Sequence, residues 1–124
     1  MFAENTNIKK LFIHPIFFFG LVLRLAFIFG VVPVAVALWY APFLAASTAT
    51  LTLDPWTTWL AGGGAFAAFP YGYAMWLAFL PMTLIAKLTG LPLQYGYAMT
   101  LLIADLCLLY SLDKLLPGRQ KLLL

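Results

Sequence analysis

The sequence predicts an all-α integral membrane protein that forms a single transmembrane domain over residues 1–124. The chain is 65% hydrophobic and only 9% charged, and its mean hydropathy is +0.99. Soluble domains carry about 25% charged residues, so a soluble protein is excluded. A chain of 124 residues has room for three or four membrane segments and for no soluble domain beside them. We expect about three transmembrane segments and one short interfacial helix outside the membrane.

The first expected transmembrane segment covers about residues 11–46. Its apolar stretch is far longer than the roughly 7–15 residues of a signal-peptide core, which predicts a retained span. It exceeds the roughly 20 residues that one helical crossing needs, but it is too short for two crossings and a turn. Pro15 suits the first turn of the helix, and Pro33 and Pro42 are expected to kink or end it.

Residues 47–64 form the expected external stretch. Asp54 followed by Pro55 is a strong helix start, because a carboxylate caps the first N–H groups and proline needs no partner in the first turn. Trp56 and Trp59 then fall on one face, which predicts a short helix that lies in the membrane interface. A run of three glycines ends this helix.

The second and third expected segments cover about residues 65–89 and 93–113. They are separated by Gly-Leu-Pro at positions 90–92, which is typical of a tight turn. Pro70 and Pro81 lie inside the second segment. These prolines would allow that segment to be broken and partly re-entrant, provided that protein packs around it.

Basic residues beside the apolar runs predict the orientation. Lys9 and Lys10 precede the first segment, so we expect the N-terminus in the cytoplasm. The membrane that we expect is a bacterial inner membrane. The basic residues near the C-terminus are Lys114, Arg119 and Lys121. Three full crossings would place this tail outside, against the positive-inside rule, whereas a re-entrant second segment would place it inside. The side of the tail stays open.

The few reactive side chains exclude several classes of protein. Cys107 is the single cysteine, so no internal disulfide is expected. His14 is the single histidine, and no metal-ligand spacing is present, so we expect neither a metal nor another cofactor. We interpret His14 as an interfacial residue, with a pigment or haem ligand as the alternative. The basic residues flank membrane segments rather than forming a face, so nucleic acid is not an expected partner.

Asp54 has two interpretations. It is expected at the membrane boundary, where water and a lipid headgroup can both reach it, so it is a candidate catalytic base. The alternative is a structural cap on the interfacial helix, with Trp56 and Trp59 as anchors in the interface. The residue pattern by itself favours the cap.

Arg24 and Asp105 lie inside apolar segments, where an ionised side chain costs at least about 3 kcal/mol. About 21 Å of helix separates Arg24 from Lys10, and about 14 Å separates Asp105 from Lys114, at about 1.5 Å per residue. The two side chains can therefore approach one another. We favour a structural ion pair between the first and third segments over a role in substrate binding.

Four short motifs follow one another along the chain. They are Leu21-Val-Leu-Arg24-Leu, Asp54 with Trp56 and the glycine run, Phe69-Pro-Tyr-Gly72, and Ile103-Ala-Asp105-Leu. In this order they resemble the N-terminal part of membrane glycosyltransferases of the C type, the mannosyltransferase-like branch that uses polyprenyl-phosphate sugars. The similarity spans about residues 20–116.

The resemblance implies roles for five residues. Asp54 would act as the catalytic base or support it, and Pro70 and Tyr71 would lie beside the substrate cavity. Arg24 and Asp105 would be structural residues or headgroup contacts, which also makes Arg24 a candidate substrate-binding residue. An enzyme of this kind would bind polyprenyl phosphate.

The chain departs from the family pattern at two points. Gly72 and Tyr73 stand where the family has a second proline after the tyrosine. Family members also have many more spans, and the later spans complete the groove for the donor lipid. We therefore expect a small structural subunit, not an enzyme by itself, that packs against other integral membrane proteins and lipids in a larger complex, an energy-converting one for example. The alternative is one half of a split or truncated glycosyltransferase with Asp54 as its base.

Overall fold

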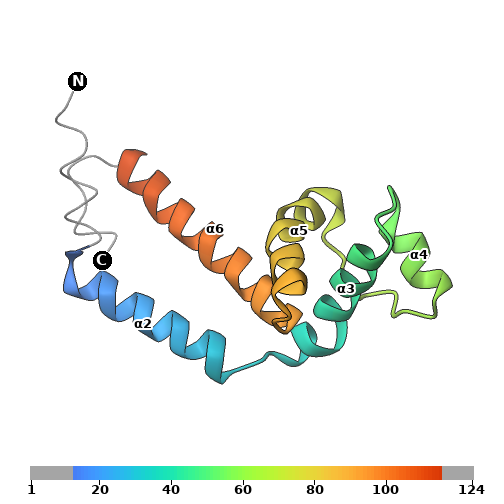
Figure 1. The fold of residues 1–124 in the computed structure, drawn as a ribbon. Helices are drawn as coiled ribbons and strands as arrows, with labels where there is room; N and C mark the ends of the chain where they lie inside the picture. The colour runs from blue at the N-terminus through green and yellow to red at the C-terminus, as the bar shows by residue number, and fades with distance from the viewer. Residues whose placement is uncertain (1–12, 116–124) are drawn as a thin grey trace. The chain divides into compact units, whose positions relative to one another are not determined.

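The computed structural model describes residues 13–115, and in this range every regular element is helical, as the sequence predicts. In chain order the elements are α2 (Pro15–Gly30), the π-helical turn η1 (Val36–Tyr40), α3 (Ala41–Ala49), α4 (Pro55–Ala61), α5 (Gly72–Thr89) and α6 (Leu93–Leu115) (Figure 1). The predicted orientation signals at Lys9, Lys10, Arg119 and Lys121 lie outside the described residues, as do the first two residues of the predicted segment 11–46.

Two of these helices are long and apolar enough to cross a membrane. They are the 18 residues Gly72–Thr89 of α5 and the 20 residues Leu93–Leu112 of α6. They correspond to the second and third predicted segments, and Pro81 lies inside α5 without ending it. The second segment starts later than residue 65, because Pro70 keeps the residue before it out of helical geometry.

The first predicted segment is not one helix, which corrects the expectation for residues 11–46. α2 has 16 residues, and a second apolar helix covers Val36–Ala49. The residues at positions 31–33 between them are not helical. Pro33 explains the break, since proline restricts the residue before it and removes a backbone N–H from the ladder.

Pro42 does not end the helix in which it lies, which is one of the two outcomes, a kink or an end, that the sequence predicts there. The chain passes from η1 into α3 without interruption, and Pro42 occupies the first turn of α3. Just before it, the N–H of Ala41 bonds to the carbonyl of Val36, five residues back. An α-helical turn here would press the proline ring against the carbonyl of Leu38, and the wider π-helical turn relieves that contact.

The chain forms two compact units. Unit 1 contains Met1–Gly30 and Leu102–Leu124, of which the structure describes α2 and the C-terminal part of α6. Unit 2 contains Val31–Leu101, and therefore η1, α3, α4, α5 and the start of α6. The external stretch predicted at 47–64 belongs to unit 2, but its first residues, Ser47 and Thr48, are buried in α3.

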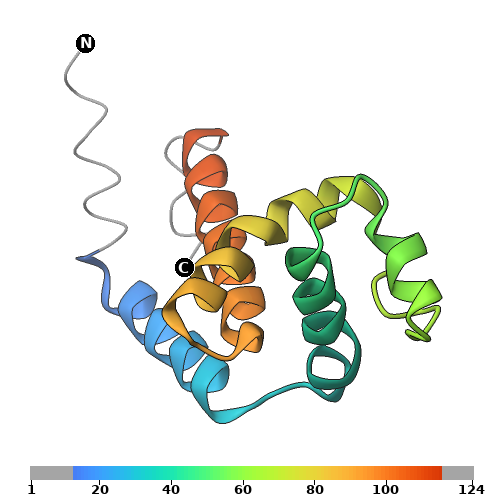
Figure 2. The ribbon, with the colours of Figure 1, turned by 45° about the vertical axis from the view of Figure 1, so that its right-hand side comes forward.

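The core of unit 2 is aromatic. In both views of the ribbon, α3 lies between α4 and α5, and it packs against each of them (Figures 1 and 2). The buried residues of the core are Phe43, Leu44, Ala68, Phe69, Trp76 and Phe79. The rings of Phe43 and Phe69 stack with their centroids 5.0 Å apart. This core fixes the segment before α5 against α3 and α4.

A tight turn joins α5 to α6, as the sequence predicts for positions 90–92. Gly90 has φ of +71°, and the N–H of Leu91 bonds to the carbonyl of Ala86 at 2.9 Å, which closes the C-terminus of α5. The start of α6 then packs closely on α5 at Gly96. A Cβ atom at this position would lie 2.7 Å from the carbonyl oxygen of Met82, so only glycine allows this approach.

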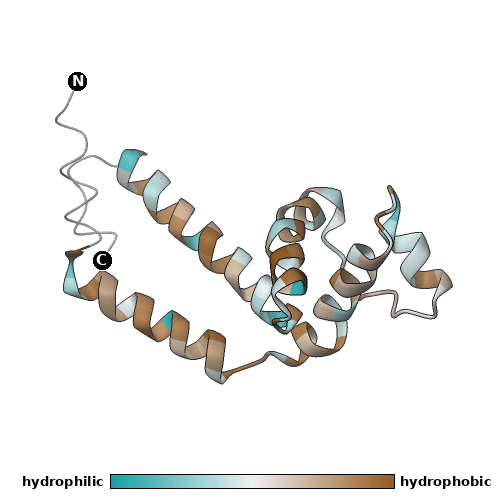
Figure 3. Ribbon diagram, viewed as in Figure 1, coloured by the Kyte–Doolittle hydropathy of each residue, from teal (hydrophilic) through white to brown (hydrophobic). Residues whose placement is uncertain are grey.

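Unit 1 contrasts with unit 2 because its first helix has no buried residue. Hydrophobic residues run along the whole of α2 (Figure 3). Phe19 and Phe27 are 69% and 59% exposed. In the described part of unit 1, the hydrogen bond between Arg24 and Asp105 ties α2 to α6. Exposed apolar surface of this extent is typical of a helix that contacts a membrane or another protein.

Candidate functional site

Asp54 caps the N-terminus of α4. Its Oδ1 accepts a hydrogen bond from the backbone N–H of Thr57 at 3.0 Å, and its Oδ2 accepts one from the Thr57 hydroxyl at 2.6 Å. Pro55 follows in the first turn, where a missing N–H loses no helical bond. The same residue three positions along the chain therefore engages both carboxylate oxygens. The arrangement is the helix start that the Asp-Pro pair predicts.

These bonds lower the pKa of the Asp54 carboxyl from its ordinary value of 3.8. The hydroxyl of Thr57 has the largest effect, and the backbone N–H of Thr57 comes next. A lowered pKa makes the carboxylate a weaker base, whereas catalytic carboxylates that accept protons near neutral pH often have a raised pKa. The bond from the Thr57 hydroxyl to Oδ2 at 2.6 Å makes that oxygen less ready to take a proton than an unbonded carboxylate oxygen. The geometry described here thus suits a cap better than a base.

A hydrogen bond joins α4 to the segment before α5. Nε1 of Trp56 donates to the carbonyl oxygen of Phe69 at 2.9 Å. Phe43 packs against both rings, with its centroid 5.5 Å from that of Trp56 and 5.0 Å from that of Phe69. The motif around Asp54 and the motif around Pro70 are therefore held in one corner of unit 2.

Tyr71 is tied to the first helix of unit 2. Its hydroxyl lies 3.0 Å from the hydroxyl of Tyr40. The ring of Tyr40 stacks on Tyr97 of α6 at 5.5 Å, and Tyr97 stacks on Phe79 of α5 at 4.6 Å. Pro70, next to Tyr71, is exposed. Tyr71 thus lies at the end of a row of contacting aromatic rings that links three helical elements. This packing accounts for the position of the Tyr71 side chain.

Lys87 makes a contact that sequence reasoning missed. Its Nζ donates a hydrogen bond to the carbonyl oxygen of Thr48 at 2.9 Å, at the C-terminal end of α3. Lys87 also lies in the last turn of α5, so one positive charge stands at the C-termini of two helices. A lysine near the end of an apolar segment indicates that its ammonium group needs hydrogen-bond acceptors. The acceptor here is a backbone carbonyl, which every residue has, so the sequence does not identify the partner.

Arg24 and Asp105 are in contact in unit 1. Nε of Arg24 donates to Oδ2 of Asp105 at 2.5 Å, and the two side chains are 43% and 36% exposed. Within residues 13–115 the Nη1 and Nη2 groups of Arg24 have no hydrogen-bond partner. The guanidinium lies over Gly20, where a Cβ atom would come within 3.0 Å of Nη1. The pair is therefore made through one edge of the arginine only.

The remaining candidate residues have local roles. Nδ1 of His14 accepts a hydrogen bond from the N–H of Ile16 at 3.3 Å, at the start of α2. Cys107 is exposed on α6. Over residues 13–115, no three or more histidine, cysteine, aspartate or glutamate side chains come close enough to hold a metal ion.

Comparisons with models of protein families, with curated proteins and with solved structures find no match to this chain. Its function is therefore inferred from the residues and their geometry. Asp54, Pro70 and Tyr71 lie in unit 2, and Arg24 and Asp105 lie in unit 1. Each group has a structural contact of its own, described above.

Proposed function

We propose that this chain is a structural subunit of a larger membrane complex. α5 and α6 hold it in the bilayer, and its other apolar surfaces pack against integral membrane proteins. We place it in a bacterial inner membrane, and an energy-converting complex is one assembly of the kind proposed. Within this assembly it resembles the front part of a C-type glycosyltransferase, with Asp54 as the cap of α4.

The observation that carries this proposal is that α2 is short, has no buried residue and contains a charged side chain. The helix has 16 residues, about 24 Å at about 1.5 Å per residue, which is less than the roughly 30 Å of a hydrocarbon core. None of its residues is buried within the described structure. It also carries Arg24, whose 43% exposed side chain is poorly suited to lipid tails. A neighbouring protein would supply what α2 lacks, namely length, cover and polar contacts.

Purification of the tagged full chain from its native membrane, followed by native mass spectrometry, tests this proposal. We expect the chain to leave the membrane with other integral membrane proteins in a fixed stoichiometry. The chain expressed alone should form aggregates or undefined oligomers in detergent, because its first helix has no buried residue within the described structure and carries a charged side chain that needs protein neighbours. A monodisperse monomer with one cooperative thermal transition would contradict the proposal.

A second function has one specific observation in its favour. The hydrogen bond from Trp56 to the carbonyl of Phe69 joins the Asp54 motif to the Pro70–Tyr71 motif. Both motifs would border the substrate in a C-type glycosyltransferase that uses a polyprenyl-phosphate sugar. The chain would then supply one half of a split enzyme, with Asp54 as the base and the partner providing the remaining spans. Turnover of a lipid-linked sugar by the purified assembly tests this function.

A further inference from the structure

The ion pair of unit 1 leaves most of its hydrogen-bonding capacity unused. A guanidinium carries five N–H donors. Among the residues that the structure describes, only the Nε donor of Arg24 is used, by Oδ2 of Asp105 at 2.5 Å. The four donors on Nη1 and Nη2 have no partner among residues 13–115. The two charges of the pair thus cancel, but most of the N–H donors of the guanidinium have no acceptor in the pair.

The surroundings make this excess significant. Arg24 lies in a helix without buried residues, and its side chain is 43% exposed. In hydrocarbon there is no water to receive the free N–H groups, and an unmet donor is unfavourable. The guanidinium lies over Gly20, which has no side chain to shield it. One edge of α2 therefore presents donors that are open to whatever packs there.

We propose that Nη1 and Nη2 of Arg24 bind a hydrogen-bond acceptor on a transmembrane helix of another protein. That helix packs on α2 along the edge formed by Gly20, Arg24 and Phe27. This inference rests on the proposed function, since it names the surface by which the subunit meets its partner. Because Asp105 already balances the charge of Arg24, the fitting acceptor is neutral, a side-chain amide or hydroxyl rather than a further carboxylate.

The position of the donors favours a protein over a lipid. Lipid tails carry no acceptors, and lipid phosphates lie at the membrane surface. Gly20, under the guanidinium, is about 8 Å of helix from Pro15 and about 15 Å from Gly30. Arg24 is also held by Asp105 instead of extending to a surface. A glycine beside a polar side chain is, in addition, the combination that lets two membrane helices approach closely and form hydrogen bonds.

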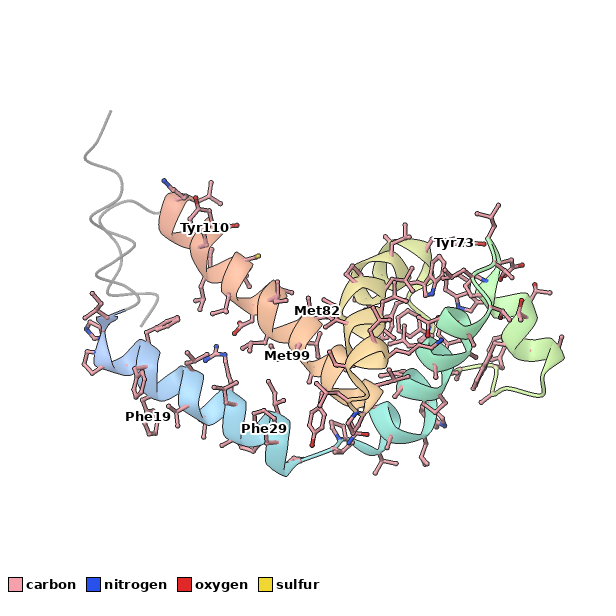
Figure 4. The ribbon with its side chains drawn as sticks, viewed as in Figure 1. Phe19, Phe29, Tyr73, Met82, Met99 and Tyr110 are labelled. Carbon is pink, nitrogen blue, oxygen red and sulfur yellow. The ribbon has the colours of Figure 1, made fainter. Side chains whose placement is uncertain are left out.

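Site-specific photo-crosslinking in the native membrane tests the inference. A photoreactive amino acid replaces Phe27 in the full-length chain, on the proposed edge. The matched control replaces Phe19, which is exposed and points away from α6 (Figure 4). Phe19 lies roughly 140° around the helix from Arg24. Mass spectrometry then identifies the crosslinked peptide.

We expect the probe at Phe27 to capture one transmembrane peptide of another protein that carries an amide or hydroxyl side chain at the contact. The probe at Phe19 should not capture that peptide. The double variant Arg24→Met/Asp105→Leu removes the donors without leaving an unpaired charge, so it should still fold. It should lower the yield of the crosslink about tenfold, as expected for the loss of one interhelical hydrogen bond. Cys107→Ala, an exposed change on α6 that keeps the ion pair and all the donors, should retain the yield.

Three results would overturn the inference. They are a crosslink to lipid only, a crosslink to a second copy of this chain, and an unchanged yield in the double variant. The proposed function fails separately, if native mass spectrometry finds the wild-type chain without any other membrane protein. If the chain stays in a complex but the probe at Phe27 crosslinks only to lipid, the inference about Arg24 is wrong and the proposed function as a subunit still stands.

Discussion

Arg24 and Asp105 are 81 positions apart in the chain, yet Nε of Arg24 lies 2.5 Å from Oδ2 of Asp105. The contact connects α2 to the C-terminal part of α6, and it is made in apolar helices where a lone charge is unfavourable. The two opposite charges balance one another within this pair of apolar helices. The energetic coupling between these two charges is the first property to be measured.

Removing either charge of this pair alone should destabilise the protein more than removing both. Arg24→Met and Asp105→Leu each leave an unpaired charge, which should cost about 3 kcal/mol. The double replacement should cost less than the worse single one. The measurement is the folded fraction of the chain in its purified assembly across a series of denaturing detergent. Cys107→Ala, an exposed change on the same helix, is the control, and simple additivity of the two single effects would show that the pair is not coupled.

Asp54 separates the two proposed functions. Asp54→Asn keeps the size and the capping ability of the side chain but not its basicity, whereas Asp54→Ala loses both. For a structural cap, Asn should assemble like wild type, and Ala should lower the melting temperature of the assembly. For a catalytic base, Asn should abolish transfer of a lipid-linked sugar while assembly persists. Measuring assembly and sugar turnover for both variants decides between the two functions. We expect Asp54→Asn to assemble as wild type does.

The stabilising effect of Asp54 should depend on pH in one direction. Folding lowers the pKa of its carboxyl below the ordinary 3.8, through the two bonds from Thr57. The stabilisation is therefore fully present above about pH 4 and is lost as the pH falls through the lowered pKa of the folded state. Melting temperatures of wild type and Asp54→Ala, compared between neutral pH and pH 3, should move closer together on acidification. A difference that grows on acidification would contradict this cause.

Gly96 should tolerate no side chain. A Cβ atom there would lie 2.7 Å from the carbonyl oxygen of Met82 and 3.1 Å from the Cα of Thr83, which are backbone atoms of α5. Gly96→Ala should thus force the two helices apart and destabilise the chain by about 1–3 kcal/mol. Gly30→Ala is the matched control, because no atom lies within 4 Å of a Cβ at that position. Detergent denaturation of the two variants should differ in this sense, and equal stability would refute the close packing.

Lys87 should matter through its charge at the end of α3. Lys87→Met removes the hydrogen bond to the carbonyl of Thr48 and should cost about 1 kcal/mol. Lys87→Arg keeps a charged donor at the same place and should lose less. The two variants can be compared by thermal melting of the purified assembly. If Met behaves like Arg, the contact does not stabilise the helix end.

The sequence predicts features that depend on one or two adjacent residues. Asp54 followed by Pro55 marks the start of α4, and Gly90 marks the turn between the last two helices, because each choice reflects local backbone chemistry. Pro33 is expected to kink or end the first segment, and it does end α2. Each of these signals depends only on neighbouring residues, so a single sequence is sufficient to show it.

Features that depend on distant packing are harder to predict. Pro42 does not end the helix, because a π-helical turn before it lets the chain continue. Lys87 binds a backbone carbonyl, and any residue at position 48 would offer one. The hydroxyl of Tyr71 meets that of Tyr40, which lies in a separate helical element. In each of these cases the partner is set by the tertiary arrangement, which leaves no periodic mark in the sequence.

The break at Pro33 has a consequence for the kind of bilayer that suits this protein. At about 24 Å, α2 is about 6 Å shorter than an average hydrocarbon core of about 30 Å. An α2 that crosses by itself would require the surrounding lipid to thin, at a fraction of a kcal/mol per Å. Thin membranes of short-chain lipids would then favour an upright α2, and thick membranes would favour its lateral association. Lipid chain length could thereby regulate how tightly this chain is held by its neighbours.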